Sequence, residues 1–195
     1  MVNTFIVNKC FRKSATQLDP TRLWKQVIEA KSILHTLTGI KKGWANHPAV
    51  LQWKGYEDCL KFYYNCHLKE WLDRGYKNNT QSYYEVDEKK VEFPYWTSCD
   101  LYINSHKASL MRKSPSYYGD KFPEVPKLYL EAGYFWPSKF TEDEVLKSKP
   151  EKILEQLGEW KQELCKGKDK AGKGCEFRAK KKGYCLRHFN KKSLV

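Results

Sequence analysis

An Asp-Pro pair followed by regularly spaced apolar residues marks the start of one long helix. Asp19 has a side chain preferred at the N-cap, and Pro20 suits the first helical position, where its missing N–H costs nothing. Apolar residues then recur at helical spacing up to Gly39, at Leu23, Val27, Ala30, Leu34 and Leu37. A chain with this pattern must bury one side of a helix. The opposite side offers Arg22, Lys25 or Gln26, and Glu29, which share a face.

Further helices are predicted along the chain, with little sheet. A second helix opens near residue 46 and runs to about residue 73, and a third lies within 96–113. Thr141 and Glu144 form a capping box before a short charged helix, and an amphipathic helix follows Pro150, with Ile153, Leu157, Trp160 and Leu164. Residues 2–7 are expected to be extended, and 122–137 ordered but irregular. We therefore expect a mainly α fold, with one compact helical domain over 1–164 and a small basic module over 165–195.

The net charge of +13 is concentrated in the last thirty residues. Residues 166–195 carry +9, whereas the preceding 165 residues carry only +4. The overall charge favours a nucleic-acid partner, but any DNA contact by the body must be argued from particular residues. Hydrophobic residues make up 41% of the chain, which is enough for a core. The sequence contains no apolar run long enough to span a membrane, and its N-terminus does not have the pattern of a signal peptide.

The basic tail contains a set of residues with metal-ligand chemistry. Cys165, Cys175, Cys185 and His188 follow the spacing C-x9-C-x9-C-x2-H. Four such ligands fit a closed tetrahedral zinc site, so we expect one structural Zn²⁺ and no organic cofactor. The tail resembles small Cys/His modules appended to viral and microbial proteins. The alternative is a disordered basic tail with three chance cysteines.

The other cysteines indicate the redox compartment. Cys10, Cys59, Cys66 and Cys99 are scattered without a repeated spacing, as expected for reduced thiols. We therefore expect an intracellular, reducing location, in the cytoplasm or nucleus, with packaging in a virion as an alternative.

Three blocks of sequence, taken in order, resemble the pyrimidine dimer DNA glycosylase family. They are residues 18–30 (LDPTRLWKQVIEA), 43–75, and 106–119 (HKASLMRKSPSYYG). The third is the most specific. The first departs from the expected pattern, because Trp24 stands where relatives have Gly and Val27 where they have Arg. The resemblance covers roughly residues 1–137 and implies a DNA repair enzyme.

The resemblance also implies a particular chemistry. The chain's own α-amine forms a Schiff base with the deoxyribose and releases it by β-elimination, so the nucleophile would be Val2 after removal of Met1. An α-amine has a pKa of about 8, so a far larger fraction of it is neutral at pH 7 than of a lysine. It needs a carboxylate nearby and an extruded nucleotide. We assign the carboxylate to Glu29, beside Arg22 on the same face, with Glu57 and Asp58 in reserve.

Further residues of the three blocks are candidate contacts to double-stranded DNA. They are Lys25, Gln26, His47, Lys54, His106, Lys107, Arg112, Lys113, Tyr117 and Tyr118. Each has a structural alternative, such as a solvated helix face, a helix cap at His47 or packing of the tyrosines. The resemblance implies a monomer that works away from membranes. Two other functions stay open: a DNA-binding protein of the same fold without catalysis, and a zinc-dependent nucleic-acid-binding adaptor.

Overall fold

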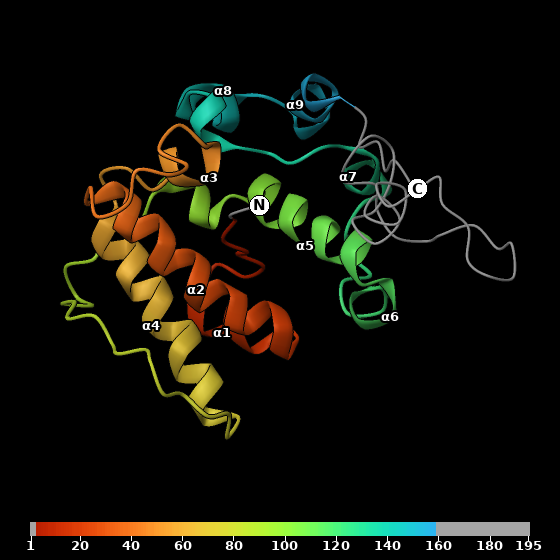
Figure 1. Ribbon diagram of the computed structural model, residues 1–195. Helices are drawn as coiled ribbons and strands as arrows, with labels where there is room; N and C mark the ends of the chain where they lie inside the picture. Colours follow the sequence, from red (N-terminus) through yellow and green to blue (C-terminus); the bar gives the residue numbers. More distant parts are fainter. Residues whose placement is uncertain (1–2, 159–195) are drawn as a thin grey trace, which may run out of the picture. The chain divides into compact units, whose positions relative to one another are not determined.

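Residues 3–158 of the computed structural model are described here, and within them every regular element is a helix (Figure 1). The elements are α1 (Phe11–Thr16), α2 (Pro20–Leu37), α3 (Pro48–Leu51), α4 (Glu57–Asp73), η1 (Tyr95–Ser98), α5 (Asp100–Lys113), α6 (Pro115–Tyr118), α7 (Lys127–Glu131), η2 (Pro137–Lys139), α8 (Glu142–Lys147) and α9 (Pro150–Leu157). The predicted mainly α fold is confirmed. None of the described helices combines the length and apolar composition that a membrane crossing requires.

Helix α2 begins where the sequence predicted. Asp19 is its N-cap, and its carboxylate accepts a hydrogen bond from the Arg22 N–H at 3.1 Å. The buried residues of the helix are Leu23, Gln26, Val27, Ala30, Ile33 and Leu34. Figure 1 shows α2 running beside α4, which presents a buried aromatic side that includes Tyr63 and Tyr64. Helix α2, which the amphipathic pattern predicted, therefore forms one side of the hydrophobic core.

The predicted helix over 46–73 is wrong in one respect, because the structure divides it. Helix α3 ends at Leu51, and α4 begins at Glu57. Gly55 lies between them with φ of 85°, a left-handed conformation that interrupts a helix and that glycine adopts at little cost. His47 caps α3, since its Nδ1 accepts the Ala49 N–H at 3.1 Å. The short helices α1, α6 and α7 were not predicted.

An extended segment at the N-terminus lies inside the core. Residues 3–7 are all buried and run between α2 and α5 (Figure 1). Side chains from three elements accept the backbone N–H groups of this segment: Phe5 to Gln26 Oε1 (2.7 Å), Ile6 to His106 Nδ1 (3.1 Å) and Val7 to Ser14 Oγ (2.9 Å). The Tyr63 hydroxyl donates to the Phe5 carbonyl at 2.9 Å. Because buried backbone groups need partners, these polar side chains fix the path of the segment.

Two buried histidines make the fold sensitive to acid. Burial lowers the pKa of His106 to about 3 and that of His67 to about 4. In the unfolded chain both have an ordinary pKa near 6.5, so the unfolded state binds more protons as the pH falls below that value. The free energy of unfolding is therefore highest above pH 6.5, where both histidines are neutral in the folded and the unfolded state. Between pH 6.5 and pH 5 each histidine should lower it by about 2 kcal/mol. Urea denaturation at a series of pH values measures this, and a stability that is constant from pH 7 to pH 5 would contradict it.

Candidate active site

Glu29 lies where the buried N-terminal segment meets α2. Its Oε2 accepts a hydrogen bond from the Asn3 backbone N–H at 2.7 Å. Burial raises the pKa of the Glu29 carboxyl, while the bond from Asn3 and the nearby charges of Lys25 and Lys113 act in the opposite direction. A carboxyl group whose pKa is raised by burial holds its proton more readily than an exposed one, which suits acid–base chemistry.

The Asn3 side chain beside this carboxylate is buried without a partner. Only 3% of the residue is exposed, and neither Oδ1 nor Nδ2 makes a hydrogen bond among the described residues. Leaving a buried amide unsatisfied costs free energy, so this side chain has polar groups open to a further partner. Sequence reasoning missed Asn3, because an asparagine near a chain end gives no sign of being buried.

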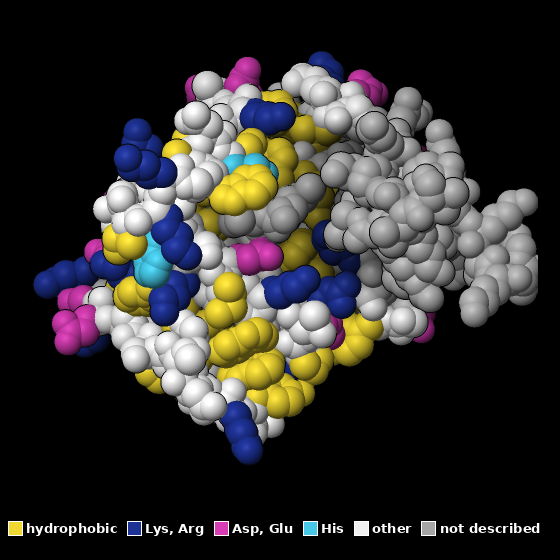
Figure 2. All heavy atoms as spheres, in the orientation of Figure 1, with side chains coloured by type: hydrophobic (Ala, Val, Ile, Leu, Met, Phe, Trp, Pro, Cys, Tyr) yellow, Lys and Arg dark blue, Asp and Glu magenta, His cyan; other side chains and the backbone are white. Residues whose placement is uncertain are grey.

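Two lysines from different helices flank Glu29. Lys25 lies one turn before it on α2, and Lys113 ends α5; both side chains are exposed. The Lys113 Nζ lies 6.0 Å from the ring centroids of Phe5 and Tyr134. Figure 2 shows hydrophobic side chains lining a hollow on this face and lysine and arginine side chains gathered at its rim. Two exposed cations around one carboxylate are suited to binding the phosphates on either side of a nucleotide.

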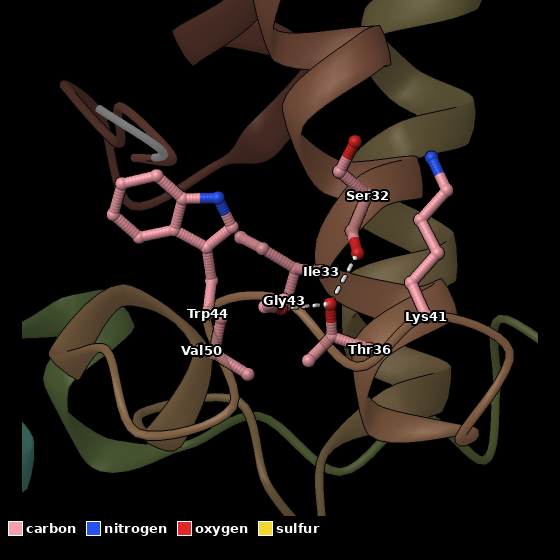
Figure 3. Close-up of a pocket in the computed structure, with 7 residues that line it drawn as sticks. All are labelled: Ser32, Ile33, Thr36, Lys41, Gly43, Trp44 and Val50. Atoms are coloured by element: carbon pink, nitrogen blue, oxygen red, sulfur yellow. Dashed lines mark hydrogen bonds between the residues drawn. The ribbon is translucent and has the colours of Figure 1, made fainter.

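A cavity of about 290 Å³ opens on the same side of α2 (Figure 3). It is lined by Ser32, Ile33, Thr36, Lys41, Gly43, Trp44 and Val50. Ser32, Ile33 and Thr36 follow Glu29 by three, four and seven residues, so they share its helix face. Trp44 is 57% exposed and packs edge-on against the imidazole of His47 at 5.3 Å.

The structure corrects three of the predicted DNA contacts. Gln26 is 1% exposed, and His106 and Tyr118 are 0% exposed, so none of these side chains can reach a ligand on the surface. Gln26 and His106 hold the N-terminal segment instead. The Tyr118 hydroxyl donates to the carboxylate of Asp19, and its oxygen accepts the Asp19 N–H at 3.0 Å. All three are polar residues that satisfy buried backbone or capping groups.

Other predicted residues have local partners. The structure does not bring Arg22 to Glu29. The Arg22 Nε lies 3.5 Å from the Asp19 carboxylate. Arg22 and Glu29 are roughly 10 Å apart along the helix axis. Lys107 pairs with Glu124 at 2.6 Å, and Arg112 donates to the Tyr129 carbonyl at 2.7 Å.

The reserve carboxylates and the remaining predicted contacts lie elsewhere on the chain. Glu57 accepts the Gly55 N–H at 3.1 Å, and Asp58 pairs with Lys61 at 2.7 Å. Both are therefore tied to the start of α4. Lys54 and Tyr117 are exposed.

Several predicted features lie outside the described residues. They are the nucleophile Val2, the helical positions Trp160 and Leu164, the boundary at 164/165 and the zinc ligands Cys165, Cys175, Cys185 and His188. The structural zinc therefore stays a prediction. The reducing location and the monomeric state also stay predictions, because no observation on the described residues tests them.

A comparison with known protein families matches the part of the chain that contains both Glu29 and the N-terminal segment. Residues 2–84 match the family model of the pyrimidine dimer DNA glycosylases. The region that matches the glycosylase model runs from the N-terminal segment through α4, and it includes Glu29 and the whole cavity lining. It excludes α5, which supplies His106 and Lys113. No curated protein and no solved structure matches the chain. The match to the glycosylase model supports a broad function in DNA repair.

Proposed function

We propose that the protein is a DNA glycosylase with AP-lyase activity that removes a damaged or modified pyrimidine from double-stranded DNA. Its nucleophile is the α-amine of Val2 after removal of Met1, and Glu29 is the carboxylate that manages protons. The observation that carries the proposal is the 2.7 Å hydrogen bond from the Asn3 N–H to Glu29. The match of residues 2–84 to the pyrimidine dimer DNA glycosylase family supports the broader function of a DNA repair glycosylase.

The covalent chain limits how far the amine of Val2 can be from Glu29. One residue spans at most about 3.6 Å from its own nitrogen to the next. Because the Asn3 nitrogen is 2.7 Å from Glu29 Oε2, covalent geometry alone limits the distance between that oxygen and the α-nitrogen of the preceding residue to roughly 6 Å. This limit allows a sugar carbon to lie between the two groups. The proposal therefore needs no rearrangement of the core.

The protonation behaviour of Glu29 fits the steps required. The neutral amine attacks the sugar C1′, the glycosidic bond breaks, and the base leaves with its electron pair and takes up a proton. Opening of the sugar ring then gives the Schiff base, and β-elimination moves a C2′ proton to a base and expels the 3′ phosphate. A carboxyl whose pKa burial raises can donate the first proton and accept a later one. Lys25 and Lys113 supply positive charge for the flanking phosphates.

Borohydride trapping tests the proposal. Reduction should link the protein covalently to duplex DNA containing an abasic site, because hydride converts the Schiff base into a stable amine. Adding one residue before Val2, or acetylating its amine, should lower trapping by at least about 100-fold, since the nucleophile is displaced or lost. Intact mass first establishes that Met1 is absent.

The matched control is the Lys89→Ala variant with a free N-terminus, which removes an exposed amine outside the site and should trap as the unmodified protein does. Trapping that survives N-terminal blocking would overturn the assignment of Val2. Binding to DNA without any adduct would indicate a non-catalytic DNA-binding protein.

A further inference from the structure

We propose that a row of apolar side chains, where α2 meets the end of α4, binds unpaired nucleotides of the DNA strand that carries the lesion. This aromatic row consists of Ile28, Trp24, Trp71 and Tyr76. The inference rests on the proposed glycosylase function, which it deepens by naming the class of DNA. The preferred substrate is a lesion beside a bubble, a gap or a frayed end.

Three rings of the aromatic row contact one another in sequence. The centroids of Trp24 and Trp71 lie 4.8 Å apart with 38° between their planes, and those of Trp71 and Tyr76 lie 4.2 Å apart with 33° between theirs. Trp71 thus contacts two rings, and its Nε1–H donates to the Lys77 carbonyl at 2.9 Å. Among the described residues, Trp24 and Tyr76 each contact only one ring of the row, so both ends can accept a further ring. Every nucleic-acid base offers such a ring, whatever the sequence.

The aromatic row is open to solvent. Its three rings are each partly exposed, and Ile28 is 39% exposed although its side chain is wholly apolar. Figure 2 shows hydrophobic side chains gathered over this part of α2. The Trp24 Nε1–H has no acceptor among the described residues. Trp24 therefore keeps both ring surface and a hydrogen-bond donor for a ligand, and a stacked base would cover apolar area that now faces water.

The aromatic row begins beside the candidate active site. Ile28 follows Trp24 by one turn and precedes Glu29 by one residue, so it lies between the two on the solvent side of α2. Trp24 is about 7.5 Å from Glu29 along the helix axis. A stacked strand advances about 3.4 Å per nucleotide, so the strand bonded to the attacked sugar reaches Trp24 within a few nucleotides. In a duplex those bases are paired and stacked on their neighbours, so only unpaired ones can lie on the rings.

The charges around the aromatic row suit a strand of phosphates. Lys25 and Lys77 are exposed, and neither forms a salt bridge with a described carboxylate. The two carboxylates near the end of α4 already have partners, in the pairs Glu70–Arg74 (2.7 Å) and Lys69–Asp73 (2.8 Å). Aromatic rings with uncompensated cations beside them are the combination by which proteins bind single-stranded nucleic acid. This combination favours an unpaired DNA strand over an apolar protein partner as the occupant.

The test measures binding to DNA that the amine chemistry cannot consume. A tetrahydrofuran analogue of the abasic site, which has no aldehyde for a Schiff base, is placed in a fully paired duplex or beside a short bubble. In fluorescence anisotropy at one salt concentration, the full-length protein should bind the bubble at least about tenfold more tightly than the paired duplex. Trp24→Ala should weaken binding to the bubble by about 5- to 100-fold and to the paired duplex by less than about twofold. Trp24→Phe, which keeps a ring, should stay within about threefold on both.

Tyr83→Ala is the matched control, because it removes a ring that is 52% exposed outside the aromatic row and should change neither affinity. Equal affinity of the unmodified protein for both DNAs would overturn the inference. Equal losses by Trp24→Ala on both DNAs would show that its ring packs the fold or contacts duplex. Undiminished binding of Trp24→Ala to the bubble would leave the rings to a protein partner, and either result overturns the inference. Borohydride trapping without a preference for the bubble refutes the aromatic row alone, whereas the preference without trapping refutes the amine chemistry alone.

Discussion

Replacing Glu29 with glutamine is expected to slow Schiff-base formation by about 100- to 10,000-fold, the range that a positioned acid–base group contributes. The substitution keeps the size of the side chain, and the amide oxygen can still accept the Asn3 N–H that Glu29 Oε2 accepts at 2.7 Å. The geometry of the N-terminal segment should therefore be preserved while the proton-transfer function is lost. Single-turnover borohydride trapping on abasic duplex DNA measures the rate.

Two controls separate catalysis from folding and binding. Glu57→Gln removes a carboxylate that contacts the Gly55 N–H at the start of α4, and it should trap within about twofold of the unmodified protein. Binding of Glu29→Gln to the same duplex should be retained or tighter, because a negative charge is removed beside Lys25 and Lys113. A Glu29→Gln variant that keeps more than a tenth of the rate would contradict the assignment.

Replacing His106 with alanine is expected to lower the free energy of unfolding by about 2–4 kcal/mol. The imidazole is fully buried, packs against Tyr102 at a centroid distance of 4.0 Å and accepts the Ile6 N–H. Its removal leaves both a cavity and a buried donor without an acceptor. Urea denaturation at pH 7 measures the loss, and trapping on abasic DNA should fall as well, because the segment that leads to Val2 is no longer fixed.

A conservative variant distinguishes the hydrogen bond from packing. His106→Asn retains an acceptor for the Ile6 N–H and should recover part of the stability and trapping that His106→Ala loses. His35→Ala, on the partly exposed side of α2, should change the unfolding free energy by less than about 1 kcal/mol. A His106→Ala protein as stable as this control would show that the segment is held by other contacts.

The sequence predicted elements whose signals are local, and it failed where a distant segment decides the outcome. Asp19, Pro20 and the capping box at Thr141 depend on neighbouring residues, and the structure confirms them. Gln26 was predicted to contact DNA, with a solvated helix face as the alternative, because nothing in the periodicity of its helix shows that residues 3–7 cover it. His106 contacts a residue 100 positions away, so its burial could not be inferred from its own helix.

The candidate site was also predicted only in part: the sequence indicated the carboxylate but not the cavity. Assigning the carboxylate to Glu29 came from the family resemblance and helix spacing, and the contact with Asn3 supports it. The cavity was not foreseen, since it needs the loop of Lys41–Trp44 to fold back against α2 and α3. The positive φ of Trp44 could not be predicted from the sequence, because this backbone conformation is normally adopted by glycine.

The buried position of residues 3–7 also has a consequence for the order of folding. The acceptor for the Ile6 N–H lies 100 positions further along the chain, on α5. Contacts of such long sequence separation form slowly, since a large loop must close before they stabilise anything. The segment that contacts Glu29 is therefore expected to become fixed only after the local turns of α2 and α4 have formed.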